Sequence, residues 1–212
     1  MKILNLYACL GGNRYKWGDE HDITAVEWDE ELAKLYQERF PNDKVIVADA
    51  HQYLLDHYKE FEFIWSSPPC PTHSRVRVSQ KNRENFKVQY PDMKLYEEII
   101  FLDNFFNGKY VVENVIPYYE PLIPAQKRGR HLYWTNFNLP SKLNERNGGI
   151  MGSNNEIEKW CKFHDYDFRK YKGKQRLDKI ARNLVDYEAG KTILDTALGI
   201  LNKPQPNQIE LF

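Results

Sequence analysis

The apolar residues of this chain form short runs separated by longer segments with helical spacing. The runs that read as strands are residues 3–7, 23–26, 45–47, 61–65 and 110–112. Apolar positions recur at helical intervals in residues 29–40, which Pro41 ends, and in residues 93–106. Strands separated by helices indicate a parallel sheet with crossover helices. We therefore expect an α/β protein with a mostly parallel, doubly wound sheet.

Residues with useful chemistry follow each predicted strand. They are Gly11, Glu27, Asp49, Cys70 and Glu113. Ligands of open parallel sheets bind at the carboxyl ends of the strands. The pattern therefore predicts a single site along that edge of the sheet.

One of these residues lies in a rigid loop. Ser67-Pro68-Pro69-Cys70 is followed 43 residues later by Glu113-Asn114-Val115. A thiolate can attack C6 of cytosine when a nearby acid holds a proton on N3, and the adduct makes C5 nucleophilic. Alone, Pro-Pro-Cys is most often a stiff loop with a buried thiol, and Glu-Asn-Val an ordinary strand end. Their conjunction favours covalent attack on a pyrimidine ring.

At these motifs the chain resembles the cytosine-C5 DNA methyltransferases, as a small phage- or bacterial-type member. The resemblance runs from about residue 3 to about residue 201 and implies a Rossmann-like S-adenosylmethionine-dependent fold. It implies Cys70 as the nucleophile, Glu113 as the acid at N3 and Asn114 as a residue that holds the loop. Residues 126–130 resemble the family's Gln-x-Arg-x-Arg motif. There, Arg130 would hold the base O2 and the neighbouring acid, and Arg128 would steady the catalytic loop.

The same resemblance implies a site for S-adenosylmethionine, whose product is S-adenosylhomocysteine, without a metal. Glu27 would take the ribose hydroxyls, and Trp28 would pack on adenine. Asn183 falls where an Asn closes over the cofactor's carboxylate, but Arg182 replaces the usual glycine before it. Cys9 also stands where glycine is usual. The remaining residues expected at the cofactor are Tyr7, Ala8, Leu10, Gly11, Gly12, Asp49, Ala50 and Pro68.

The formal net charge is zero, but the charges are unevenly distributed. Residues 126–182 hold 14 Lys and Arg against six Asp and Glu, and residues 75–87 hold five against one. Either a solvated face or a nucleic-acid surface accounts for this, and the position beside Cys70 favours nucleic acid. The expected phosphate contacts are Arg75, Arg77, Lys81, Arg83, Lys170, Lys172 and Lys174. The aromatic residues expected to stack on bases are Tyr133, Trp134, Phe137, Trp160, Phe163, Tyr166, Phe168 and Tyr171.

We divide the chain into a catalytic domain (1–137), a short target recognition region (138–175), a segment packing back on the catalytic domain (176–202) and a tail (203–212). The 38 residues of the recognition region look like glycine-rich loops around one short helix. They can place few side chains in a major groove, so we expect a short or relaxed recognition sequence. The target base must leave the stack to meet Cys70.

The tail carries a separate signal. Residues 203–207 are rich in proline and read as an extended linker. The last five residues resemble the bacterial sliding-clamp-binding peptide, which implies that Gln208 donates hydrogen bonds and that Leu211 and Phe212 fill an apolar pocket. A frayed terminus is the alternative. Tethering to a clamp would make up for weak sequence reading.

Composition limits the cellular compartment in which we expect the protein to work. The longest apolar stretches are too short to span a bilayer, and the start lacks a signal-peptide core. Three cysteines, Cys9, Cys70 and Cys161, without metal-ligand spacing, favour a reducing cytoplasm, that of a bacterial host if the gene is phage-borne. We expect a monomer that binds double-stranded DNA and no membrane.

Four other functions stay open. An amino-methyltransferase has a similar loop, but that loop normally ends in an aromatic residue. A tRNA cytosine methyltransferase would use the same catalytic residues. An enzyme for free cytosine nucleotides would explain the short recognition region but not the basic surface. A non-catalytic, clamp-tethered DNA-binding module would need none of the catalytic set. A role in restriction–modification or in phage DNA modification is equally compatible with the sequence.

Overall fold

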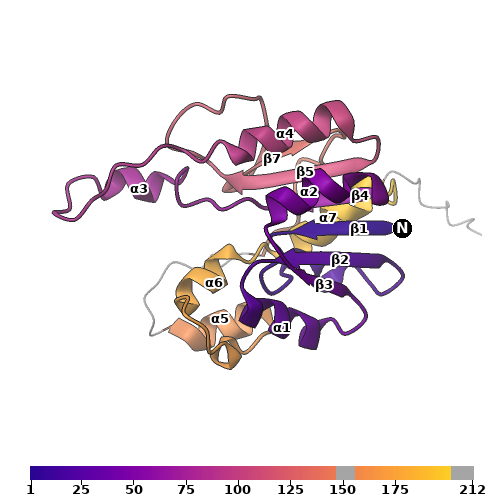
Figure 1. The fold of residues 1–212 in the computed structure, drawn as a ribbon, viewed down its shortest axis with the longest axis horizontal. Coiled ribbons are helices and arrows are strands. Elements are labelled where there is room, and N and C mark those ends of the chain that lie inside the picture. The colour runs from indigo at the N-terminus through magenta and orange to yellow at the C-terminus, as the bar shows by residue number, and fades with distance from the viewer. Residues whose placement is uncertain (147–155, 202–212) are drawn as a thin grey trace, which may run out of the picture.

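A seven-stranded sheet with helices on both faces forms the protein (Figure 1). The computed structural model describes residues 1–146 and 156–201. The predicted clamp-binding residues Gln208, Leu211 and Phe212 lie outside the described residues. Within the described ranges, no helix is long and apolar enough to cross a membrane.

The strands run in the order β3-β2-β1-β4-β5-β7-β6. Their bounds are β1 Lys2–Leu6, β2 Asp22–Glu27, β3 Lys44–Val47, β4 Phe63–Ser66, β5 Lys109–Val115, β6 Gln126–Arg128 and β7 His131–Thr135. The first five are parallel, β7 runs antiparallel to β5, and β6 antiparallel to β7. The predicted doubly wound α/β fold is confirmed. The chain order reverses between β1 and β4, which is where open sheets of this kind bind ligands.

Within residues 1–146 and 156–201, seven α-helices connect and cover the strands. They are α1 Glu30–Arg39, α2 Ala50–His57, α3 Arg75–Ser79, α4 Lys94–Phe105, α5 Ile157–His164, α6 Leu177–Asn183 and α7 Tyr187–Ala197. The two helices predicted from spacing correspond to α1 and α4. Helix α7 begins at Tyr187 because the Asp186 side chain caps the backbone N–H groups of Glu188 and Ala189. It ends before Gly199, which takes a left-handed conformation with φ of 70°.

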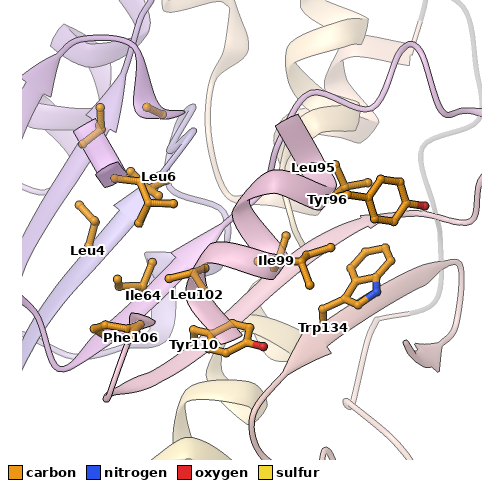
Figure 2. Close-up of a cluster of buried hydrophobic side chains, with 14 of the residues drawn as sticks. Leu4, Leu6, Ile64, Leu95, Tyr96, Ile99, Leu102, Phe106, Tyr110 and Trp134 are labelled. Carbon is orange, nitrogen blue, oxygen red and sulfur yellow. The ribbon is translucent and has the colours of Figure 1, made fainter. Parts of the chain in front are cut away.

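Helices α2 and α4 cover one face of the sheet. Leu95, Ile99 and Leu102 follow one stripe of α4 and pack on Leu4, Ile64 and other strand residues, as Figure 2 shows. Full burial of one such side chain contributes about 1.5–3 kcal/mol to the stability of the folded state. This cluster holds the carboxyl ends of β1, β4 and β5 in fixed positions.

Helix α7 covers the opposite face. Ala189, Ile193 and Leu194 pack with buried residues of β1 and β4. Gly190 lets the helix touch the 3-10 turn Asn13–Lys16, because a Cβ at this position would lie 2.4 Å from the Asn13 carbonyl oxygen. Of the segment 176–202, which we expected to pack back on the catalytic domain, helix α7 packs on the sheet.

Five aromatic residues that we expected to stack on bases belong to the core instead. They are Tyr133, Trp134, Trp160, Phe168 and Tyr171. The first two belong to β7, and the other three pack with Leu10 and Leu32 beside the first loop. The prediction was wrong because these segments carry basic residues on the side that faces solvent and aromatic residues on the side that faces the core, and the sequence alone does not separate the two sides. The described part of residues 138–175 contains one short helix, α5, as the pattern predicted, and a 3-10 turn at Phe168–Lys170.

Candidate active site

The loop that carries Cys70 leaves the carboxyl end of β4 and is held from two sides. The indole Nε1 of Trp65 donates to the Ser67 hydroxyl at 2.8 Å. The Nδ2 of Asn114, buried on β5, donates to the Pro68 carbonyl at 2.9 Å. Beyond the cysteine, the chain turns so that the Cys70 carbonyl accepts two backbone N–H groups at 3.0 Å. Cys70 therefore lies in a loop whose backbone positions are fixed by neighbouring strands.

Asn114→Ala is expected to lower both stability and catalytic rate. Loss of the amide leaves the buried Pro68 carbonyl without its donor, which costs about 1–3 kcal/mol. A shift of the loop by about 1 Å would slow transfer about 100-fold. Thermal melting and methyl-transfer assays measure the two effects. Asn136→Ala is the matched control, because its amide also bonds a backbone carbonyl, that of Gly108, which precedes β5 at the end opposite Asn114. Equal loss of rate in both variants would contradict the prediction.

The Cys70 thiol is protonated in the resting site. Burial and the nearby negative charge of Glu113 raise its pKa to about 11, although the charge of Lys179 acts in the opposite direction. The reactive form of cysteine is the thiolate. Attack therefore requires that the thiol proton be removed when the substrate is in place.

Glu113 lies inside β5 instead of following it, because antiparallel pairing with β7 extends the strand to Val115. Its buried carboxylate is 3.6 Å from Nε2 of His131, across the β5–β7 pair. We expected Arg130 to hold this acid. Arg130 is exposed and lies near Glu145, whose pKa its charge helps to lower against a larger effect of burial. His131, and not its neighbour Arg130, is the partner of Glu113 because successive side chains along a strand point to opposite faces of the sheet.

Arg128 does not steady the catalytic loop as we expected. Its guanidinium donates to the carbonyls of Leu139 at 2.8 Å and Pro140 at 2.5 Å. Arg128 therefore fastens the chain after β7 to β6.

A cavity of about 1560 Å³ opens in front of Cys70. In Figure 1 the segment of α3 and the segment of α5 and α6 flank the strand ends where it lies. The described cationic residues on its wall are Arg75, Arg77, Arg83, Lys87, Arg130, Arg146, Arg176, Lys179 and Arg182. The acidic ones are Glu145, Asp178 and Asp186. The cavity is therefore strongly basic.

The structure brings only part of the predicted phosphate-binding set to this cavity. Arg75, Arg77 and Arg83 line it, whereas Lys81 and the lysines of residues 170–174 do not. The side chain of Tyr171, in the middle of that second group, instead bonds Asp29 at the start of α1. Sequence reasoning missed the basic residues of α6, which we had assigned to packing.

The loop after β1 has an unusual backbone. Tyr7, Cys9 and Gly11 have positive φ values of 56°, 49° and 67°. This conformation is uncommon for residues other than glycine and is often found at functional sites. A Cβ at Gly11 would lie 2.4 Å from the Phe40 ring, and one at Gly12 would lie 2.5 Å from a backbone oxygen of the chain before α7. Both glycines are therefore required for packing, whatever the loop binds.

Glu27 and Trp28 fit the ribose and adenine of S-adenosylmethionine. The Glu27 carboxylate is buried, and its oxygens accept the N–H groups of Cys9 at 2.8 Å and Asp29 at 3.0 Å. Each oxygen keeps a lone pair for a hydroxyl group. The indole of Trp28 is 67% exposed, unlike most tryptophans, and offers its face to a planar ligand.

The other residues expected at the cofactor differ in what they can offer. Asp49 caps α2 through the N–H of Gln52 and is otherwise exposed, so it can accept a ligand's amino group. Asn183 lines the Cys70 cavity. Leu10 and Ala50 have side chains in the core, so only their backbones can face a ligand. Ala8 and Pro68 are buried too.

A buried carboxylate on α4, Glu98, escaped the sequence analysis. It accepts hydrogen bonds from the Tyr7 hydroxyl and the Ser66 hydroxyl, both at 2.5 Å. His51 on α2 lies 3.0 Å away, and this contact raises the His51 pKa. The network ties the first loop to β4 at the point where the strand order reverses. The available signal was an acid on the apolar stripe of α4, three residues after Leu95.

The described part of residues 138–175 is bound to the cofactor side of the sheet. Asp29, next to Trp28, accepts hydrogen bonds from Tyr171 at 2.9 Å and Gln175 at 2.8 Å. Arg39 donates to the carbonyls of Leu10 and His164, both at 3.0 Å. Asp29 and Arg39 therefore connect the loops after β1 and β2, where we expect the cofactor, to the predicted recognition region.

A family model identifies the first half of the chain. The model described as "C-5 cytosine-specific DNA methylase" matches residues 1–115. The chain belongs to this family of cytosine-specific DNA methylases. It is accordingly an S-adenosylmethionine-dependent cytosine-C5 methyltransferase. A search of curated proteins found no match.

Solved structures share the fold of this methylase. A variant of DNMT2 from Spodoptera frugiperda is 14% identical, with a TM-score of 0.53 over 93% of this chain and 99% of that one. The methyltransferase EhMeth of Entamoeba histolytica is 10% identical, with a TM-score of 0.53 over 96% of this chain and 99% of that one. At such low identity the likeness shows the fold alone. Among the described residues of the methylase, no group of His, Cys, Asp or Glu side chains is placed to hold a metal ion.

Proposed function

We propose that the protein methylates C5 of a flipped cytosine in double-stranded DNA through a covalent adduct with Cys70, with short or relaxed sequence specificity. The observation that carries the proposal is the pair of Cys70, on its fixed loop after β4, and Glu113, inside β5 and close enough to raise the pKa of the thiol. A half-buried thiol beside a buried carboxylate is suited to addition with proton transfer, and Cys70 lies on the wall of a basic cavity.

In the proposed reaction, the thiol proton of Cys70 passes to the Glu113 carboxylate as the sulfur bonds to C6. Glu113 in turn gives a proton to N3, so the C5–C6 electron pair becomes available at C5. S-adenosylmethionine, when bound by Glu27, Trp28 and Asp49, supplies the electrophilic methyl group for C5. Loss of the C5 proton to solvent then re-forms the double bond and expels the thiolate, and the proton on N3 returns through Glu113 to the sulfur of Cys70. The proton balance thus closes on these two side chains and water.

The substrate assignment rests on charge and on the size of the recognition region. The basic wall of the cavity suits the phosphate backbone. The described part of residues 138–175 directs Trp160, Phe168 and Tyr171 into the core. Few side chains remain there to read base edges, which accounts for relaxed specificity.

Labelled methyl transfer to duplex DNA, single-stranded DNA, tRNA and free cytosine nucleotides tests the proposal. Digested products are identified by mass spectrometry, with Cys70→Ala alongside the unmodified enzyme. We expect 5-methylcytosine in duplex DNA from the unmodified enzyme alone. A preference for tRNA or free nucleotides would replace the substrate. Methylation by Cys70→Ala at an unreduced rate would refute the covalent mechanism.

A further inference from the structure

A buried carboxylate on α6 holds two arginine side chains at the mouth of the cavity. Asp178 is 2% exposed. Its Oδ1 accepts from Nε of Arg176 at 2.9 Å, and its Oδ2 from Nη2 of the same side chain at 3.1 Å. The guanidinium of Arg182 bonds the same carboxylate and also the Asp178 carbonyl at 3.1 Å. One buried acid therefore fixes the positions of two cations.

The two arginines remain open to ligands despite these bonds. The side chain of Arg176 is 72% exposed and that of Arg182 is 49% exposed. A guanidinium has five N–H donors, so each keeps several free. A fixed guanidinium loses less conformational entropy on binding and can meet a phosphate with two parallel bonds.

The two arginines held by Asp178 lie on the wall of the Cys70 cavity. Arg176, Lys179 and Arg182 line the same cavity as Cys70. Arg75, Arg77 and Arg83, from the segment after Cys70, line it as well. The cavity thus has two separate basic walls, one from the α3 segment and one from α6. In Figure 1 these segments flank the carboxyl ends of the strands.

We propose that the face of α6 formed by Arg176, Lys179 and Arg182 binds the phosphate backbone of one strand of a DNA duplex, while the basic α3 segment contacts the other strand. Two basic walls match the two backbones of a duplex, whereas a single strand would need only one. Arg182, which replaces the glycine expected before Asn183, gives this chain a phosphate contact where a small residue would give none. Phosphate contacts position the duplex without reading sequence. The inference rests on the proposed function and names the element that holds its substrate.

The salt dependence of binding tests this role. A fluorescein-labelled duplex is titrated with unmodified protein and with Arg176→Gln/Arg182→Gln, between about 50 and 200 mM salt. Log K falls with log salt, and each lost phosphate contact reduces the magnitude of this negative slope by about 0.9, so we expect the magnitude to decrease by about 2. The matched control is Lys34→Gln/Arg169→Gln, which also removes two positive charges from exposed sites outside the cavity. It should keep the unmodified slope.

Removal of both arginines leaves Asp178 buried without its partners, which can unfold the protein. Asp178→Asn/Arg182→Gln avoids this, because it removes the buried charge together with one partner. We expect its slope to fall by about 0.9. Binding of S-adenosylmethionine, measured by calorimetry, checks that each variant is folded.

An unchanged slope in a folded variant, or an equal fall in the control, would overturn the inference. Tighter, arginine-dependent binding of single-stranded DNA or tRNA would overturn the assignment to duplex. These binding data are independent of chemistry. Methyl transfer to duplex DNA with unaltered salt slopes would refute α6 alone, whereas absence of transfer to any substrate would refute the proposed function.

Discussion

Glu113→Gln is expected to slow methyl transfer by about 10²–10⁴-fold while making Cys70 more reactive toward an alkylating reagent. The amide cannot give a proton to N3, so transfer loses its general acid. The same change removes the negative charge that, after burial, most raises the pKa of the Cys70 thiol. Below the pKa, each unit by which it falls increases the thiolate fraction about tenfold, partly offset by lower nucleophilicity.

Iodoacetamide labelling at pH 8 measures the second effect, and digestion with mass spectrometry separates Cys70 from Cys9 and Cys161. Because the pKa is about 11 in the unmodified protein, its labelling should still increase with pH well above pH 8. Glu120→Gln, a change of the same kind at an exposed site, should alter neither rate. Slower labelling of Cys70 in Glu113→Gln would show that the two groups are not electrostatically coupled.

Gly190→Ala is expected to have the largest effect on stability. The added methyl group would lie 2.4 Å from the Asn13 carbonyl oxygen and 2.7 Å from the Asn13 Cα, and neither backbone atom can move freely. Overpacking of this kind costs about 1–3 kcal/mol or more. Displacement of α7 would also break the bond from Trp17 Nε1 to the Gly190 carbonyl, 3.1 Å long. For a chain of this size, we expect the melting temperature to fall by about 4 °C or more.

Lys191→Ala is the control for this substitution. Its side chain is half exposed and makes an ion pair with Asp195 one turn away, which contributes about 0.3–0.5 kcal/mol. The melting temperature should change by about 2 °C at most. Calorimetry of both variants decides the matter. A melting temperature of Gly190→Ala equal to that of the unmodified protein would mean that α7 does not pack closely on the first turn.

The sequence was sufficient to predict the fold and to single out residues that lie in short motifs. Alternating runs and helices predict a doubly wound sheet because both elements have their own periodicity. Cys70 and Asn114 could be singled out because each lies in a short motif. Their hydrogen-bonded connection through Pro68 needed the structure.

The remaining site residues depend on register and on packing partners. His131, and not Arg130, faces Glu113 because of the pairing of β5 with β7, which no local pattern fixes. Trp160 looked like a surface aromatic because lysines flank it on both sides, although its inner partners are apolar. Asp178 looked like an ordinary helix acid, since the sequence does not show that it is buried.

The hydrogen bonds of Asp29 have a thermodynamic consequence. This residue follows Trp28, which we propose packs on the cofactor's adenine, and it also holds Tyr171 and Gln175, which belong to the segment leading into α6. A ligand that strengthens these bonds at one end changes the free energy of binding at the other. Linkage makes such an effect mutual: any factor by which S-adenosylmethionine raises the affinity for DNA equals the factor by which DNA raises the affinity for S-adenosylmethionine. Occupancy of the two sites would then rise together as either partner becomes abundant.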